Sequence, residues 1–362
     1  MKSGRLSLFN MMISGFPNTL CGRRGRDEEI HKICESIRAA GRAGLPVIQY
    51  NVYAHRAVEG YYEEVGRAGA GLLAGVCVWL LYYSVYRASG SLTAGAIAGL
   101  LLAVNPGFML TSRLGRMDVF SICFLLAGLL CVTEFCVTNS GQAYIRYLMP
   151  GGWLMGIATL MHLNSIAFVV ATVILLFTLA GPSFSRRVLY VFTFGLPALL
   201  PLTAWLIFAL IHGHEAFESQ FVNTALNRSA AHIGLLSRIP AELMRQVQSY
   251  SRTPLFPLCF LAGSVWLFRQ SSATTKMIRP LKMLVATTYL FNTFAMGKVS
   301  GFYQLYPNIT STAAAGIMIG VLIRQGTQRT RWFLKIALVL LVLNRVILRP
   351  EVTCLALSTA NA

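Results

Sequence analysis

Charged residues are scarce in this chain of 362 residues, and acidic residues are the scarcest. Only 12% of the residues are charged, against about 25% in an average soluble domain. Thirteen are acidic, and only Asp27 and Asp118 are aspartates. Hydrophobic residues make up 55% of the chain, and the mean hydropathy is +0.60. This composition excludes an ordinary soluble enzyme, a disordered tail and a disulfide-rich mini-protein, and it predicts a protein surrounded by lipid.

Familiar motifs of soluble enzymes are absent as well. The eight cysteines form no C-x-x-C pair and have no spacing typical of a metal site. The sequence contains no Walker loop, H-E-x-x-H, G-x-S-x-G or nucleotide-binding fingerprint. The net charge of +18 would suit nucleic acid, but most basic residues fall in short gaps between apolar runs. We therefore expect no nucleic-acid partner, and we attribute the positive charge to orientation in the membrane.

Residues 1–70 differ from the rest because they hold seven of the thirteen acidic residues. The spacing of isoleucines after Asp27 predicts a helix, and glycines at 41 and 44 can end it. The segment LPVIQYNVY (45–53) then predicts a strand. A helix followed by a strand is one unit of an α/β fold, so we expect a short α/β fragment here. Seventy residues of this kind are too few to bury a core alone.

Apolar runs dominate the chain from Gly71, and residues 72–211 contain only eight charged residues. The runs cover residues 71–86, 92–111, 119–138, 151–180, 188–211, 255–268, 281–297, 305–323 and 332–348. A membrane helix needs about 20 residues, so we divide the run 151–180 at its polar centre, MHLNS (161–165). The sequence therefore predicts an all-α, multi-pass cell-membrane protein with about 9–10 spans over residues 71–350, and a tail at 351–362.

Lysine and arginine prefer cytoplasmic loops, and this preference orients the predicted spans. Dividing the run 151–180 places the most basic short loops on one side: 181–187, 269–279 and 324–331. The opposite, external face then gathers the turn 111–118, the turn at His162, the loop 212–254 and the turn 298–304. Two amphipathic patterns in the loop 212–254 predict helices at the membrane surface. They either cover a lipid-substrate site or simply rest on the interface.

Two of the predicted external turns carry candidate site residues. TSRLGRMD (111–118) offers Arg113 and Arg116 to an anion, and Asp118 to a sugar hydroxyl or an arginine. The alternative is that Asp118 only caps the following helix, because aspartate is a common N-cap. MHLNS contributes His162 and Asn164. A single histidine within an apolar stretch also has a purely structural explanation.

A third candidate cluster lies in GKVSGFYQLYPN (297–308). Lys298 stands at the end of a predicted span, and Tyr303, Gln304 and Tyr306 follow it. A snorkelling lysine with interfacial tyrosines is one explanation. The other is a phosphate site, because the lysine ammonium is a point charge with three hydrogen-bond donors.

Residues of about 72–348 resemble the membrane glycosyltransferases of the C superfamily, especially the protein O-mannosyltransferases and the lipid A aminoarabinose transferases. Three pieces in this order carry the resemblance: a small-residue helix followed by SRLGRMD, the helix and turn GGWLMGIATLMHLNS, and the late turn GKVSGFYQLYP. The resemblance implies a polyprenyl-phosphate sugar donor and transfer at the external face. Asp118 is then the catalytic candidate. The expected substrate-binding residues are Arg113, Arg116, His162, Asn164, Lys298, Tyr303 and Gln304. The acceptor is not specified, no metal ligand is expected, and a divalent metal is an optional aid to the leaving phosphate.

Family members begin with a membrane helix and an external loop that bears a catalytic acidic residue, and neither is visible here. One expectation is therefore a transferase that is inactive because this part is missing. Residues of about 7–71 instead resemble the N-terminal part of mannonate dehydratases, through SLFNMMISGFPNTLCGRRGRDEEIHKICESIRAAGRAGLPVIQYNVYAHRAVEGYYEEVGRAGAG. That family is a TIM barrel whose divalent-metal ligands lie farther along its chain. We interpret the chain as a dehydratase fragment fused to a truncated transferase.

Three classes of function remain open on the sequence. The first is a membrane glycosyltransferase with a polyprenyl-phosphate donor and the lipid bilayer as partners. The second is a hydro-lyase of the mannonate dehydratase type, which metal-dependent loss of water from a sugar acid would reveal. The third is a transporter or another non-enzymatic membrane protein, which an inverted repeat of spans would favour.

Overall fold

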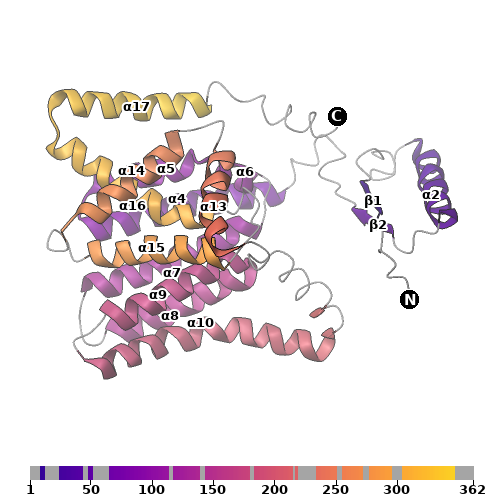
Figure 1. The fold of residues 1–362 in the computed structure, drawn as a ribbon, viewed down its shortest axis with the longest axis horizontal. Helices are drawn as coiled ribbons and strands as arrows, with labels where there is room; N and C mark the ends of the chain where they lie inside the picture. Colours follow the sequence, from indigo (N-terminus) through magenta and orange to yellow (C-terminus); the bar gives the residue numbers. More distant parts are fainter. Residues whose placement is uncertain are drawn as a thin grey trace. The chain divides into compact units, whose positions relative to one another are not determined.

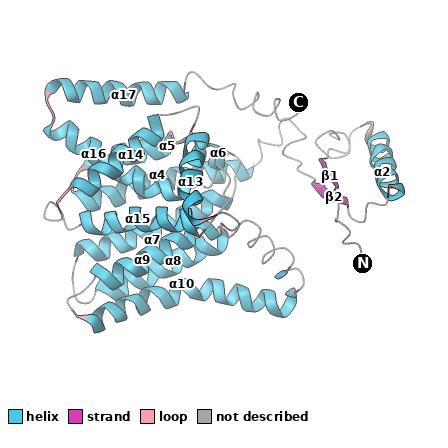
Figure 2. Cartoon of the chain, viewed as in Figure 1, coloured by secondary structure: helices cyan, strands magenta, loops and turns pink. Residues whose placement is uncertain are grey.

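The computed structural model describes residues 9–12, 24–43, 48–51, 65–113, 117–138, 143–179, 183–214, 217–218, 234–250, 255–271, 277–295 and 304–346. By its internal contacts the chain divides into two compact units, Met1–Ala68 and Gly69–Ala362. Helices dominate the described residues, with two short strands in the first unit (Figure 2).

The first unit contains two parallel strands with a helix between them in the sequence. Strand β1 (Phe9–Met12) pairs with β2 (Ile48–Asn51), and helix α2 (Arg26–Arg42) connects them along the chain. Parallel strands require such a crossover connection. Helix α2 corresponds to the helix predicted from Asp27, and its first turn carries three acidic residues that favour the positive end of the helix dipole. Its described side chains are exposed or half-buried, so this helix adds little to a core.

The second unit is helical throughout its described residues (Figure 1). Its helices are α4 (Val65–Ser89), α5 (Leu92–Ala103), α6 (Pro106–Arg113), α7 (Met117–Thr138), α8 (Ala143–Met161), α9 (Ile166–Leu179), α10 (Phe184–His212), α13 (Leu235–Ser249), α14 (Leu255–Arg269), α15 (Ile278–Phe294), α16 (Leu305–Gln325) and α17 (Gln328–Val346). Helix α8 packs against α7 and α10, and α16 packs against α5 and α14. Helix α9 packs against α10 and α8, and α15 joins the two groups through its contacts with α9 and α16.

Four helices of the described part are long and apolar enough to cross a membrane: Ala70–Ser89, Met117–Thr138, Phe184–His212 and Leu305–Gln325. Three shorter apolar helices cover Leu92–Ala103, Leu163–Leu179 and Leu255–Arg269. Large apolar side chains on α10, such as Phe192, Phe208 and Ile211, are exposed, as expected where lipid is the solvent. The chain is an integral, multi-pass membrane protein, whereas the total of 9–10 spans stays a prediction.

The structure confirms the division of the run 151–180 and corrects the run 92–111. Helix α8 ends at Met161, a 3-10 turn covers Leu163–Ser165, and α9 begins at Ile166. The run 92–111, predicted as one span, is instead two helices, α5 and α6.

Asn105 and Pro106 explain the break between α5 and α6. Proline has no N–H to continue the α5 ladder, and it suits the first position of a new helix. The buried Asn105 Oδ1 accepts hydrogen bonds from the backbone N–H groups of Gly107 (2.9 Å) and Phe108 (3.3 Å), and so caps α6. The Asn-Pro pair was a turn signal in the sequence, and the continuous apolar run on both sides concealed it.

Two glycines let α8 and α10 approach each other closely. A Cβ atom at Gly152 would collide with the carbonyl oxygen of Phe194, and one at Gly156 with that of Ala198. The two glycines are four residues apart and therefore share one helix face, the small-xxx-small pattern of membrane helix packing. Helix α8 continues beyond this contact to Met161, and the turn at His162 follows.

Candidate functional site

Asp118 lies in the first turn of α7 and is almost completely buried, with 2% of its surface exposed. The helix begins at Met117, so Asp118 is inside the first turn, one residue beyond the helix start. A carboxylate is favourable there because it faces the positive end of the helix dipole. Burial of an ionisable group inside a membrane protein costs free energy, so the residues that contact Asp118 indicate its role.

His162 is the first partner of Asp118. Its Nε2 lies 3.5 Å from Asp118 Oδ1. Its Nδ1 accepts a hydrogen bond from the backbone N–H of Asn164 at 3.3 Å, which caps the 3-10 turn. An accepting Nδ1 carries no proton, so the ring proton of the neutral imidazole lies on Nε2 and points at the carboxylate.

Tyr306 is the second partner and comes from the first turn of α16. Its hydroxyl donates to the same Asp118 Oδ1 at 3.5 Å. Its ring stacks on His162, with centroids 5.0 Å apart and planes inclined by 18°. The structure therefore brings together residues from three turns that the sequence placed on one face. Both contacts to the carboxylate measure 3.5 Å, which is longer than an ordinary hydrogen bond.

A second polar cluster lies on α13, inside the loop 212–254. Glu242, Gln246 and Tyr250 are spaced four residues apart and share one face of the helix. Glu242 Oε1 accepts hydrogen bonds from Asn292 Nδ2 and from Gln246 Nε2, each at 3.1 Å. Gln246 Nε2 also donates to Oε1 of Gln304 at 2.6 Å. The polar face of α13 therefore meets α15 and the start of α16.

Asn308 and Tyr250 extend this cluster into the bundle. Asn308 Nδ2 donates to Gln246 Oε1 at 3.0 Å and to the Tyr250 hydroxyl at 3.1 Å. The Tyr289 hydroxyl donates to Asn308 Oδ1. Asn105 Nδ2 reaches the Tyr250 hydroxyl at 3.3 Å, so the capping residue of α6 belongs to the same network.

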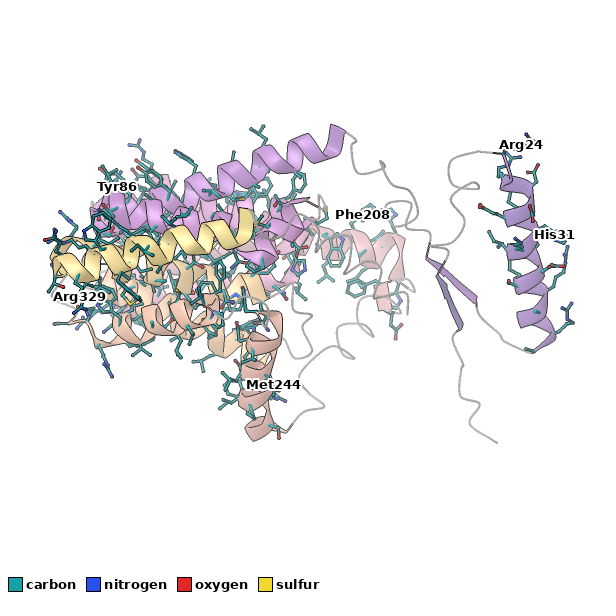
Figure 3. The ribbon with its side chains drawn as sticks, turned by 90° about the horizontal axis from the view of Figure 1, so that it is seen from above. Arg24, His31, Tyr86, Phe208, Met244 and Arg329 are labelled. Atoms are coloured by element: carbon teal, nitrogen blue, oxygen red, sulfur yellow. The ribbon has the colours of Figure 1, made fainter. Side chains whose placement is uncertain are left out.

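The opposite face of α13 is apolar and exposed. Its exposed side chains are Ile239, Leu243, Met244 and Val247. Figure 3 shows Met244 on α13, which projects from the helical bundle in that view. An amphipathic helix whose polar face meets protein and whose apolar face is open suits the edge of a bilayer. Whether α13 lies at the membrane surface stays a prediction.

Two buried amide groups at this site have a donor to spare. Asn164 Nδ2 and Gln304 Nε2 have no hydrogen-bond partner among the residues that the structure describes. Asn164 is 5% exposed and Gln304 is fully buried. Leaving such a donor unsatisfied costs about 1–3 kcal/mol, so each is a suitable contact for an oxygen atom of a ligand. Both were predicted as substrate-binding residues.

The remaining predicted residues are cationic or aromatic. Arg116, Lys298 and Tyr303 lie outside the described residues, and so does the side chain of Arg113, the last residue of α6. Within the described ranges, no group of three His, Cys, Asp or Glu side chains could hold a metal ion. Glu242 was not among the residues predicted from the sequence. Its signal was the repeat of polar residues at 242, 246 and 250 along one face of an amphipathic helix.

The arrangement has two chemical capacities. Asp118 with His162 and Tyr306 forms a buried acidic group with two proton-bearing partners, which can hold a hydroxyl or a proton. The two amide donors can bind uncharged or anionic oxygen atoms. A sugar joined to a phosphate offers both kinds of partner.

Comparison with known proteins finds one similar family and one similar solved structure. The family described as dolichyl-phosphate-mannose-protein mannosyltransferase matches residues 44–208. These residues include Asp118, His162 and Asn164. The match begins inside the segment that resembles mannonate dehydratases, and no comparison supports that second resemblance. No curated protein matches the chain.

One solved structure is similar over most of the chain: the crystal structure of ArnT from Cupriavidus metallidurans bound to undecaprenyl phosphate. The TM-score is 0.52 and the sequence identity 16%, over 75% of this chain and 48% of the other. The chain thus spans about half the length of that protein. The likeness shows the fold. The helical unit shares the fold of that protein, and residues 44–208 are similar to the mannosyltransferase family.

Proposed function

We propose that this chain is a membrane glycosyltransferase that takes a sugar from a polyprenyl-phosphate donor at the external face of the membrane. The observation that carries the proposal is the convergence of Asp118, His162 and Tyr306 from three turns of the bundle. The match to a mannosyltransferase family and the fold shared with a protein that binds undecaprenyl phosphate support it. Because the chain covers about half of that protein, the donor and the transfer belong to the proposal.

In the proposed reaction, the bond between the sugar C1 and the donor phosphate breaks, and a bond from C1 to the acceptor oxygen forms. The leaving polyprenyl phosphate keeps the electron pair, so positive charge near it lowers the barrier. We assign this role to Lys298, Arg113 and Arg116 because of their place in the predicted external turns.

The described polar residues bind the sugar end of the donor in this proposal. Asp118 accepts a hydrogen bond from a sugar hydroxyl, and the contacts with His162 and Tyr306 hold its carboxylate in place. Asn164 and Gln304 donate from their unsatisfied amide groups to oxygen atoms of the sugar or phosphate. Tyr303 is assigned to the same surface from the sequence.

We also propose that residues 7–71 derive from a mannonate dehydratase. The parallel β1–α2–β2 unit supports this, because a TIM barrel repeats strands and helices in this order. Two strands cannot close a barrel or assemble its catalytic face, so we expect no dehydratase activity from this segment. Metal-dependent loss of water from mannonate by the purified chain would contradict this expectation.

Binding of a sugar-bearing donor tests the transferase proposal. Mannosyl undecaprenyl phosphate is offered to the full chain in detergent, and wild type is compared with Asp118→Asn. Loss of the carboxylate removes a charged hydrogen bond, so affinity falls roughly tenfold to hundredfold. The control is Glu134→Gln, which removes a carboxylate that pairs with Arg87 at 2.9 Å, about 24 Å farther along α7. If both variants bind the donor as wild type does, Asp118 has no such role.

A further inference from the structure

We propose that Glu242 is a positioning residue for this site. Through Gln246, its carboxylate fixes which end of the Gln304 amide faces a bound ligand. The inference rests on the proposed function, because the ligand is the polyprenyl-phosphate sugar. It adds α13, a helix outside the region matched by the mannosyltransferase family, to the substrate-binding machinery.

The direction of the hydrogen bonds follows from the chemistry of a carboxylate, which only accepts. Gln246 contacts Glu242 Oε1 and must therefore present its NH₂ group, Nε2, on that side. The same Nε2 donates to Gln304, so Gln304 must turn its oxygen toward Gln246. The NH₂ group of Gln304 is then the end left for another partner.

Asn308 holds Gln246 from the other side. Its Nδ2 donates to Gln246 Oε1 at 3.0 Å, and its own oxygen accepts from the Tyr289 hydroxyl. A flipped Gln246 would set two NH₂ groups against each other at Asn308, and two oxygens against each other at Glu242. The contacts at both ends of Gln246 therefore require the same orientation of its amide group. Through Gln246, Glu242 in turn fixes the orientation of the Gln304 amide group.

In this orientation, the NH₂ group of Gln304 is the end that can donate to a ligand. Gln304 is fully buried, and its Nε2 has no partner within the described part of the chain. It lies just before Tyr306, whose hydroxyl contacts Asp118. The hydrogen-bond partner that suits Gln304 Nε2 is an acceptor oxygen, from either the phosphate or the sugar of the polyprenyl-phosphate sugar.

A charge swap tests the relay without changing the net charge. In the double variant Glu242→Gln with Gln246→Glu, the carboxylate stands next to Gln304 and attracts its NH₂ group. The oxygen of Gln304 then faces the ligand, and affinity falls roughly tenfold to hundredfold. Gln304→Met, which removes the donor outright, shows a similar loss. Adding the swap to Gln304→Met causes no further loss, because the swap acts only through Gln304.

Three probes identify the acceptor oxygen: undecaprenol, undecaprenyl phosphate and mannosyl undecaprenyl phosphate. If the swap weakens both phosphate-bearing probes, the partner of Gln304 is a phosphate oxygen. A loss confined to the mannosyl probe assigns a sugar hydroxyl. If the swap does not fold, the double variant Glu242→Gln with Asn308→Leu serves, because it removes both groups that orient Gln246. Equal populations of the two Gln304 orientations then halve the competent fraction and weaken binding about twofold.

The outcomes separate the two proposals. Wild type that prefers neither phosphate-bearing probe to undecaprenol contradicts the proposed function, and this inference with it. Wild type that prefers them, with a folded swap that binds as wild type does, overturns the role of Glu242 alone. The role of Glu242 is also overturned if the losses of affinity from the swap and from Gln304→Met multiply in the triple variant. The swap would then act through repulsion between the moved carboxylate and the ligand, and not through Gln304.

Discussion

Replacement of His162 by phenylalanine separates the role of its ring from the role of its nitrogens. Phenylalanine can keep the stack on Tyr306, which has a centroid distance of 5.0 Å. It removes the acceptor for the Asn164 N–H and the donor to Asp118 Oδ1. The substitution therefore destabilises the protein through lost hydrogen bonds while the packing is largely retained.

The expected size follows from the two contacts. Loss of a helix-capping acceptor costs about 0.5–2 kcal/mol. Loss of a hydrogen bond to a charged group costs about 1.5–3 kcal/mol. The two contacts of His162 measure 3.3 and 3.5 Å, which is long for hydrogen bonds, so the lower end of each range applies. Together they give about 2 kcal/mol.

Unfolding of the purified protein by SDS in mixed micelles, followed by circular dichroism, measures this change. The matched control is His212→Phe at the end of α10. His212 also lies beside an aromatic ring, Phe208, at 4.7 Å, but its side chain is exposed. The control should change the free energy of unfolding by less than about 0.5 kcal/mol. Equal stability of the two variants would refute the reasoning about the His162 hydrogen bonds.

Three further predictions concern the fold. Gly156→Ala should destabilise by about 1–3 kcal/mol, because its methyl group meets the α10 backbone. Gly195→Ala, on α10 with open space around it, should stabilise by about 0.5–1 kcal/mol in the same assay, and the reverse order would contradict the packing of α8 on α10. In a cysteine-free background, a cysteine at Ser237 should react with an external thiol reagent and one at Ser271 should not, and the opposite pattern would reverse the orientation. Residues 1–70 alone should melt without cooperativity, and a sharp two-state transition would show a self-sufficient fold.

The turn at His162 could be predicted because local polarity and loop charge pointed to the same division of the run 151–180. The place of Asp118 at a helix start followed from the end of one apolar run and the beginning of the next. In both cases the information lay within a few neighbouring residues. The Asn-Pro break at Asn105 was equally local, but the hydropathy of its surroundings concealed it.

The partners of these residues could not be predicted in the same way. Asp118 and Tyr306 are 188 residues apart in the sequence, and no local pattern pairs them. Glu242 contacts Asn292, fifty residues away, through an amide that lies within an apolar run. The polar stripe of α13 predicted an amphipathic helix, but only the packing shows that its polar face meets protein.

Recognition of a phosphate on a polyprenyl chain is the central claim, and the affinities of the full chain for undecaprenyl phosphate and undecaprenol test it most directly. The two lipids differ only in the phosphate. Wild type should prefer undecaprenyl phosphate, and Lys298→Ala should weaken its binding roughly tenfold to hundredfold while leaving undecaprenol unchanged. Equal affinity of wild type for the two lipids would contradict the account.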